Sequence, residues 1–472
     1  MDFLHNFLNN LLVSHLLSSL ILLVMLSLVL SLLRSRRPPG STLAWIFAII
    51  LIPYLGIPLY LTFGTRKIKN RVKKKKWLRR EKSGLPPGAE PFGKILYSSG
   101  IYPPLSNSDI KILTSGEDSY NVLISEIENA KHSIDIEVYV FSRDPVGMLI
   151  LNKLIERAKA GIKVRLLVDA WGSSFLIRPS FKELKKAGGM VTFFLPLIHN
   201  PAQGRTNLRN HRKLAIFDDQ VAIFGGMNYA DEYMGPAPDS QRWSDLCVRL
   251  EGLAIEPLIE IFNSDWKMFS KDKVKNNYHI DKSKSGVPEN ARKDQHIVQI
   301  VASGPDINGD PLYDGLLTSC FEAKEKIWLT TPYFVPDGAL LKALTLACQR
   351  GVDVRILVPK RSNHLFADLC RGSFLRELHE AGAKISLAQK MTHAKLMIID
   401  DHVAVVGSAN FDLRSLLYNY ELGIFLYYRP DVRELIDWYA ERYQDASVYQ
   451  IHRSSWMRES IEGVLRIFGP LF

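Results

Sequence analysis

Two short segments of the 472-residue chain carry the same reactive side chains at the same spacing. Both read H-x-K-x4-D and continue into a glycine-containing turn: His211, Lys213, Asp218, Gly225, Gly226 and Asn228 in the first segment, and His393, Lys395, Asp400, Gly407, Ser408 and Asn410 in the second. Alternate residues of a strand share a face, so each histidine is expected on the same side as its lysine. A lysine cation neutralises phosphate oxygens, while an imidazole attacks phosphorus or carries a proton. The two segments therefore predict a phosphate site.

The other residues of the two segments are expected to support this site. Asp218 and Asp400 have the opposite strand parity and stand at predicted turns, which suits bracing better than attack. Gly225 and Gly407 allow a close backbone approach. Three side chains can donate hydrogen bonds to phosphate: Asn228, Ser408 and Asn410. Two complete copies at matching positions argue against the alternative of two purely structural hairpins.

An attacking imidazole must be neutral and held in one tautomer, which a carboxylate on its other nitrogen achieves. Asp245 follows His211 by 34 residues, and Glu421 follows His393 by 28 residues. Each half of the chain thus offers one candidate carboxylate for this role. Ordinary exposed carboxylates remain the alternative at both positions.

The two motifs end an internal repeat that begins beyond residue 105. Three stretches of the first half recur 190 to 194 residues later: 130–141 with 323–334, 160–168 with 350–358, and 184–188 with 378–382. Hydrophobic periodicity predicts helices over 121–130, 147–160 and 181–187, and strands over 134–141, 164–168, 191–194, 221–224 and 403–406. Strands that alternate with helices predict an α/β fold with mixed, largely parallel sheets.

This repeat sets the expected domain boundaries. We expect the first half over 105–270, with its motif in 205–232, and the second half over 296–472, with its motif in 387–414. The polar stretch from about 270 to 295 connects them.

The first 65 residues are predicted to form a membrane hairpin. Residues 11–33 contain no ionised side chain, and a helix of this length spans about 35 Å, enough to cross a bilayer. A second apolar helix is expected over about 43–63, after a short turn that contains Arg34, Arg36 and Arg37. A cleaved signal peptide fits poorly, because a basic start, a short apolar core and a small-residue cleavage site are missing.

Residues 66–104 are a predicted linker, and the basic run within 66–82 bears on topology. This run belongs on the cytoplasmic side of the membrane, so the remainder of the chain is expected in the cytoplasm. It also favours anionic lipid, with a solvated linker as the alternative. Two full crossings of the membrane are favoured, but they place Arg34 on the opposite side of the membrane from the larger basic run. A re-entrant second segment is the alternative, and helix-breaking residues support it: Pro53, Gly56 and Pro58.

Charge and cysteine usage exclude some classes of protein. The net charge of +11 comes from residues 1–82, which hold 14 basic and 2 acidic side chains. The other 390 residues hold 46 basic and 47 acidic side chains and are nearly neutral. A nearly neutral body argues against nucleic acid as a partner, since backbone binding needs many Lys and Arg contacts. The four cysteines show no CxxC pair or zinc spacing, so we expect reduced thiols and no metal: Cys247, Cys320, Cys348 and Cys370.

The duplicated motif resembles that of the phospholipase D superfamily over about residues 105–472. The resemblance implies a pseudo-twofold α/β fold in which both motifs meet at one metal-independent active site. One histidine would form a phosphohistidine, and the other would protonate the leaving alcohol and deprotonate the acceptor. The residues it places in the site are His211, Lys213, Asp218, His393, Lys395 and Asp400. Gly226 departs from the family pattern, which often has Ser there.

Within the superfamily, the layout is similar to that of the bacterial cardiolipin synthase family. The similar stretches are Pro53-Tyr-Leu-Gly56, Leu59-Tyr-Leu-Thr-Phe-Gly64, Asn207-Leu-Arg-Asn-His211, Ser408-Ala-Asn-Phe-Asp-Leu-Arg-Ser415 and the C-terminal 455–472. The resemblance implies phosphatidyl transfer between two phosphatidylglycerol molecules, giving cardiolipin and glycerol at a cell membrane without a cofactor. A homo-oligomer is compatible with it.

The order of the two histidines and the acceptor stay open at this point. We expect His211 as nucleophile and His393 as acid and base, although the repeat is nearly symmetric. A membrane-bound phospholipase D-type phosphodiesterase that uses water or another alcohol is the enzyme alternative. A membrane scaffold with a catalytically inactive site is the non-enzyme alternative, and two complete motifs argue against it.

Overall fold

A computed structural model describes residues 2–34, 39–64, 92–106, 109–173, 177–195, 208–270 and 296–450, with residues 460, 462–463 and 465–466. The chain divides into an N-terminal unit, Met1–Arg66 with Leu197–Asn207, and a body, Lys67–Pro196 with Leu208–Phe472. The predicted basic run within 66–82 lies outside the described residues.

The N-terminal unit contains three apolar helices: α1 (Asp2–Leu33), α2 (Pro39–Leu51) and α3 (Pro53–Phe63). The stretch Leu12–Leu33 of α1 is long and apolar enough to cross a membrane, as the sequence predicted. Leu32, Ile49 and Tyr60 are buried where the three helices pack together, and the ring of Trp45 contacts that of Tyr60 at 5.4 Å.

The second predicted helix is not continuous over 43–63, which corrects the expectation. It breaks at Ile52, because Pro53 has no N–H to donate and its ring clashes with the preceding turn. A Cβ on Gly56 would lie 2.0 Å from the carbonyl oxygen of Ala48, so only glycine fits where the chain folds back. At 1.5 Å per residue the 13 residues of α2 cover about 20 Å, which is short of the bilayer core.

The first half of the body is a seven-stranded sheet with the order β2-β8-β7-β6-β3-β4-β5. Its strands are β2 (Asp109–Leu113), β3 (Ser133–Val138), β4 (Lys163–Asp169), β5 (Met190–Phe194), β6 (Leu214–Phe217), β7 (Val221–Gly225) and β8 (Cys247–Glu251). Its helices are α6 (Gly116–Asn129), α7 (Pro145–Lys159), α8 (Phe181–Lys186) and α9 (Ile255–Phe269). Ser115 and Asp144 begin α6 and α7 by accepting hydrogen bonds from backbone N–H groups of the first turn.

The second half repeats this arrangement in a nine-stranded sheet with the order β1-β9-β17-β15-β14-β10-β12-β13-β18. The strands are β1 (Leu105–Ser106), β9 (Ile297–Ser303), β10 (Lys326–Thr330), β12 (Asp353–Pro359), β13 (Lys384–Ala388), β14 (Leu396–Ile399), β15 (Val403–Gly407), β17 (Glu421–Leu426) and β18 (Ser447–Val448), with β11 (Phe334–Val335) and β16 (Phe411–Asp412) as a separate pair. The helices are α5 (Phe92–Ser98), α10 (Pro311–Glu322), α11 (Gly338–Gln349), α12 (Leu365–Glu380), α13 (Leu413–Leu417) and α14 (Arg429–Gln444).

The predicted α/β fold with two related halves and mixed sheets is confirmed, but the parallel share is smaller than expected. Parallel pairing joins β3, β4 and β5 in one sheet and β10, β12 and β13 in the other, where helices provide the crossovers. The strands of each motif pair antiparallel, because three-residue turns join β6 to β7 and β14 to β15.

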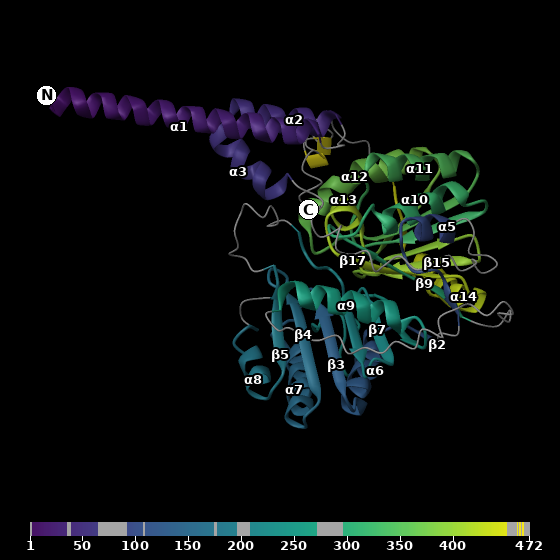
Figure 1. Cartoon of the computed structure of the whole chain (residues 1–472). Coiled ribbons are helices and arrows are strands. Elements are labelled where there is room, and N and C mark those ends of the chain that lie inside the picture. Colours follow the sequence, from purple (N-terminus) through teal and green to yellow (C-terminus); the bar gives the residue numbers. More distant parts are fainter. Residues whose placement is uncertain are drawn as a thin grey trace. The chain divides into compact units, whose positions relative to one another are not determined.

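One apolar cluster joins the two halves. It combines residues of both sheets with residues of α9 and α14, for example Leu214, Phe262, Ile398 and Leu435. Two further clusters lie under the outer helices, α6 to α8 in the first half and α10 to α12 in the second. Figure 1 shows α9 on the face of the first sheet that is turned toward the second half. The body therefore has its main core where the halves meet.

The boundary of the first half differs from the expected residue 105. Leu96 of α5 and Ile101 are buried in the core under the outer helices of the second half, and β1 pairs with β9. Gln299 donates a hydrogen bond to the carbonyl oxygen of Tyr102 at 2.8 Å. The end of the predicted linker is thus part of the second half.

Candidate active site

Each motif enters the site by pairing with the opposite half. The N–H of His211 donates to the carbonyl oxygen of Tyr420 at 2.9 Å, and the N–H of His393 donates to that of Ser244 at 2.7 Å. Isolated bridges join the same segments, Asn210 with Tyr420 and Ser244 with Thr392. The histidines and lysines lie directly before β6 and β14 rather than within them. The contact between the halves therefore sets the position of both imidazoles.

Asp245 holds His393, and both residues are almost fully buried. Its Oδ2 lies 2.6 Å from Nδ1 of His393, while its Oδ1 accepts a hydrogen bond from the N–H of Leu246 at 2.8 Å. Burial by itself would raise the pKa of Asp245, but Lys395 and His393 hold it below the ordinary value. Asp245 is therefore a charged partner that orients the histidine of the other half.

Glu421 holds His211 in the same way. Nδ1 of His211 lies 3.1 Å from Oε1 of Glu421 and 3.0 Å from the carbonyl oxygen of Ser408. The hydroxyl of Ser408 donates to Oε2 of Glu421 and accepts from the N–H of Leu422 at 3.0 Å. Sequence spacing had placed each carboxylate in the same half as a histidine, but the structure exchanges them between the halves.

These contacts assign the tautomer of each histidine. Carboxylate and carbonyl oxygens only accept hydrogen bonds, so Nδ1 of His211 and of His393 carries the proton. Nε2 then holds the lone pair in both rings. No described cation lies within hydrogen-bond distance of Nε2 in His211, whereas Nζ of Lys395 is 3.1 Å from Nε2 of His393. The same Nζ lies 2.6 Å from Nδ1, which donates its hydrogen bond to Oδ2 of Asp245.

Burial keeps both imidazoles neutral. It lowers the pKa of His211 below its ordinary value, against the opposing charge of Glu421. Burial and then Lys395 lower the pKa of His393 to about 3. Aromatic rings make up the surroundings, with Tyr139 at 4.9 Å from His211 and Tyr233 at 4.9 Å from His393, between ring centroids.

The two lysines supply positive charge to the same space. Lys213 and Lys395 donate to the carbonyl oxygens of His211 and His393, and Lys213 also lies over the ring of Tyr139 at 5.4 Å. Burial lowers the pKa of Lys213 to about 7 and that of Lys395 to about 8, and each lysine interacts with the other and with both carboxylates. Two buried cations that repel each other form a place for an anion.

Asp218 and Asp400 are not brought to the imidazoles. They stand at the far ends of β6 and β14 with φ of 50° and 43°. Asp218 accepts hydrogen bonds from three consecutive backbone N–H groups, of Lys131, His132 and Ser133, at 2.7 to 2.8 Å. Asp400 accepts the equivalent three from residues 324–326. These contacts hold the start of β3 and β10 beside the motif strands, as the expected bracing role requires.

The turn residues of the two motifs differ in what they support. A Cβ on Gly226 would lie 2.1 Å from Oδ1 of Asp245, so the carboxylate fills the space that a serine side chain would need. The second motif has the longer Glu421 and keeps its serine. Cβ atoms on Gly225 and Gly407 would meet backbone of the neighbouring strand at 2.3 Å. Asn228 accepts a hydrogen bond from the N–H of Val140 at 3.1 Å, and the side chain of Asn410 is hydrogen-bonded to that of Asp412.

Arg212, which stands between His211 and Lys213, is a site residue that the sequence did not reveal. It is completely buried, pairs with Asp265 of α9 and donates to the carbonyl oxygens of Glu421 at 3.1 Å and Ser303 at 3.0 Å. The second motif has Ala394 at this position. Nothing local marks a buried arginine, since its partners lie on other elements. Tyr139 and Tyr333 follow the equivalent strands β3 and β10 and contact the two histidines, but the repeat alignment pairs Tyr139 with Pro332 and so did not indicate them.

The geometry suits two-step transfer of a phosphoryl-containing group. One neutral imidazole with a free Nε2 can attack phosphorus, and the other, beside an ammonium, can exchange protons. Two lysines can neutralise the phosphate oxygens throughout.

Comparison with known proteins agrees with this geometry. A family model described as cardiolipin synthase, PLD-like domain matches residues 123–266 and 317–443, and a model described as phospholipase D-nuclease N-terminal matches residues 21–64. The major cardiolipin synthase of Bacillus subtilis is 32% identical over 465 residues, covering 93% of this chain and 95% of that protein. The cardiolipin synthase of Geobacillus kaustophilus is 32% identical over 93% of this chain and 90% of its own length.

A solved structure shares the fold. The phosphatidylserine synthase of Haemophilus influenzae matches with a TM-score of 0.58 and 16% identity, over 76% of this chain and 92% of that one.

Proposed function

Because the chain belongs to the cardiolipin synthase family of proteins with phospholipase D-like domains, we propose that it joins two phosphatidylglycerol molecules into cardiolipin and glycerol through a phosphohistidine. The observation that carries this mechanism is the pair of buried, neutral imidazoles, each held at Nδ1 by a carboxylate of the opposite half. It supports one joint site rather than two independent ones.

In the first step Nε2 of His211 attacks the phosphorus of one phosphatidylglycerol. The bond between phosphorus and the headgroup glycerol oxygen breaks, and His393 gives a proton to that oxygen. His211 is favoured as nucleophile because its Nε2 lone pair is free, whereas Nε2 of His393 faces the ammonium of Lys395 at 3.1 Å. Burial and Lys395 lower the pKa of His393 in the free enzyme, and the negative charge of a bound phosphate opposes this shift, so the complex takes up from solvent the proton that His393 gives to the leaving oxygen.

In the second step a terminal hydroxyl of another phosphatidylglycerol attacks the phosphatidyl-histidine. His393 takes the hydroxyl proton, the P–N bond to His211 breaks, and cardiolipin forms. One phosphodiester bond breaks and one of the same kind forms, so the exchange is reversible and needs no energy source. Tyr139, Tyr233 and Tyr333 line the site with apolar surface that limits water as a competing acceptor.

Trapping tests the order of the histidines. Full-length His393→Ala protein, incubated with a phosphatidyl ester of p-nitrophenol, whose leaving group needs no proton, and denatured rapidly in base, should yield a phosphorylated peptide that contains His211. The mirror variant His211→Ala should yield none. Label on His393 in the mirror variant, with none on His211 in the first, would reverse the assignment.

The acceptor is tested with detergent-solubilised protein and phosphatidylglycerol alone. Cardiolipin and glycerol in equal amounts support the synthase. Phosphatidic acid without cardiolipin would identify a phosphodiesterase that uses water instead.

For topology, the proposal is one crossing by α1 and a re-entrant pair α2 and α3, with the body in the cytoplasm. The 13 residues of α2 and the break at Pro53 support this over two crossings. It also leaves Arg34 on the same side as the basic run within 66–82. A cysteine at Ser41 should then resist a membrane-impermeant thiol reagent added outside intact cells. Labelling from outside would establish a second crossing.

A further inference from the structure

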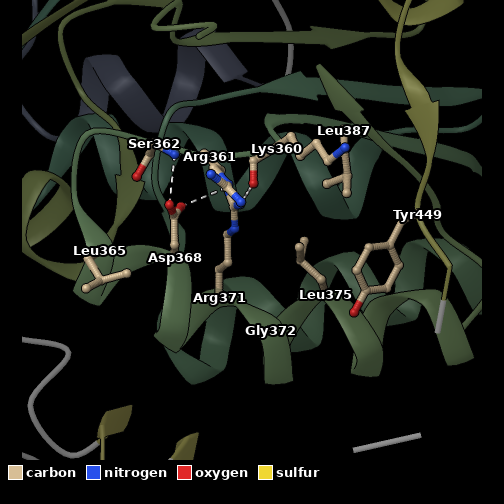
Figure 2. A pocket seen from close by; sticks show the side chains of 10 residues that line it. All are labelled: Lys360, Arg361, Ser362, Leu365, Asp368, Arg371, Gly372, Leu375, Leu387 and Tyr449. Atoms are coloured by element: carbon tan, nitrogen blue, oxygen red, sulfur yellow. Dashed lines mark hydrogen bonds and ion pairs between the residues drawn. The ribbon is translucent and has the colours of Figure 1, made fainter. Parts of the chain in front are cut away.

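A cavity of about 530 Å³ lies beside the loop that follows β12, and no residue of the two motifs lines it. Residues of this loop, of α12 and of the C-terminal region line it, including Lys360, Arg361, Asp368, Arg371, Leu375 and Tyr449. Figure 2 shows Lys360 and Ser362 across from Asp368 and Arg371, with Leu375 and Tyr449 at the other end. The volume lies within the range of about 300–1,000 Å³ that is usual for sites of small ligands and headgroups.

An ion pair between a buried arginine and a half-buried aspartate fixes the backbone of this loop. Arg371 of α12 donates to the carbonyl oxygens of Pro359 at 2.7 Å and Lys360 at 2.8 Å, and it pairs with Asp368 at 3.1 Å. Asp368 in turn accepts a hydrogen bond from the N–H of Ser362 at 2.8 Å. The loop is therefore held in place, and the charges of Arg371 and Asp368 cancel.

Two positive charges remain at the mouth of the cavity. The side chains of Lys360 and Arg361 are exposed, and neither forms an ion pair with any residue that the structure describes. The loop follows the carboxyl end of β12, between the parallel strands β10 and β13. Ligands of α/β proteins commonly bind at this end of the strands. The mouth is thus complementary to an anionic group such as a lipid phosphate.

An exposed apolar ridge stands next to these cations. Leu365, Phe366 and Leu369 occupy one face of the first turns of α12 and are 69%, 54% and 41% exposed. Leu369 is four residues after Leu365 and three residues after Phe366, so it is a neighbour of both on the helix surface. Apolar side chains next to Lys and Arg are typical of helices that enter the interface of an anionic bilayer.

The ridge and the cavity mouth lie close to the catalytic centre. Tyr333 donates a hydrogen bond to Asn363, and its ring contacts His364 at 5.0 Å and the catalytic His393 at 6.5 Å. In the first half Trp171 follows β4, the strand equivalent to β12, and is 66% exposed. Both halves therefore expose large apolar side chains at the strand ends that frame the site.

We propose that the cavity mouth and the apolar ridge form a docking site for an anionic phospholipid bilayer, in which Lys360 and Arg361 bind a lipid phosphate while Leu365, Phe366 and Leu369 enter the acyl boundary. The proposal rests on the proposed function, since it explains how lipids with two acyl chains reach a buried site. It is separate from anchoring by α1, which keeps the chain at a membrane but does not orient the body.

Two measurements on the full-length protein test it. First, a fluorophore on Leu365→Cys should be quenched by spin-labelled lipid in nanodiscs of phosphatidylglycerol, and one on Leu149→Cys, an exposed apolar position on α7, should not. Second, in mixed micelles Lys360→Gln/Arg361→Gln should raise the phosphatidylglycerol mole fraction needed for half-maximal rate by about 30-fold. This corresponds to about 1 kcal/mol for each basic residue at an anionic surface.

The matched control is Lys182→Gln/Lys185→Gln, which removes two exposed lysines of α8 and should leave the rate curve unchanged. Equal curves for both double variants, or an unquenched label at Leu365→Cys, would overturn the docking site while the wild type still makes cardiolipin. If the wild type made no cardiolipin, the proposed function would fail, and quenching at Leu365→Cys that the double variant abolishes would still support docking.

Discussion

Exchange of the two carboxylates between the halves can be tested by separating the acid step from the attack. Asp245→Asn keeps the shape of the side chain but removes the charge that lies 2.6 Å from Nδ1 of His393. For charge centres about 4 Å apart at an effective dielectric constant of about 20, the lost attraction is about 4 kcal/mol, or about 10³-fold in rate. We expect this loss in cardiolipin formation, because glycerol is a poor leaving group that needs a protonated His393.

A phosphatidyl ester of p-nitrophenol separates the two roles, since nitrophenolate leaves without a proton. The single-turnover burst of nitrophenolate should fall less than about 10-fold in Asp245→Asn. Glu421→Gln, which affects the attacking His211, should lower both the burst and cardiolipin formation by about 10-fold to 100-fold. Its effect is smaller because the carbonyl oxygen of Ser408 still holds Nδ1 at 3.0 Å.

The control for this pair is Asp353→Asn, which removes a carboxylate that pairs with Arg355 and Lys384 outside the site. It should leave both rates unchanged. Loss of the burst in Asp245→Asn together with its retention in Glu421→Gln would refute the exchanged pairing or the order of the histidines.

Three further outcomes follow from the site. The kcat/KM for phosphatidylglycerol should be highest near neutral pH. It falls as pH rises through about 7 and 8, where Lys213 and Lys395 lose their charge, and it falls at acid pH, where His211 becomes protonated below its lowered pKa. A kcat/KM that still rises at pH 10 would contradict this. Asp400→Ala should lower the free energy of unfolding by about 2 kcal/mol, because three backbone N–H groups lose their acceptor. Asp401→Ala, which removes an exposed ion pair with Lys326, should lower it by less than about 0.5 kcal/mol. Chemical denaturation measures both values, and equal values would contradict the bracing role of Asp400. Gly226→Ala should reduce kcat by about 100-fold, because the added Cβ displaces Asp245 from His393. Gly338→Ala, with no atom near its Cβ position, should retain full activity. Normal turnover in Gly226→Ala would mean that Asp245 does not position His393.

The sequence by itself determined the reactive groups and the repeated framework. The spacing of His211 to Lys213 and of His393 to Lys395 is local, and its duplication within an α/β repeat identifies the two halves of the site. The alternation of strands and helices from β3 to β5 follows from hydrophobic periodicity, and α1 from the length of its apolar run. Each of these features depends on neighbours in the chain, which is why a sequence pattern predicts them.

Only the tertiary structure decided which carboxylate serves which histidine. Asp245 and Glu421 each lie closer in sequence to the histidine that they do not hold, and the exchange arises because the motif segments pair across the halves. The same contact buries Arg212 against α9. It also buries both imidazoles, and burial lowers the pKa of each, which keeps them neutral. These effects depend on residues that are distant in the chain and adjacent in space, so no local pattern in the sequence encodes them.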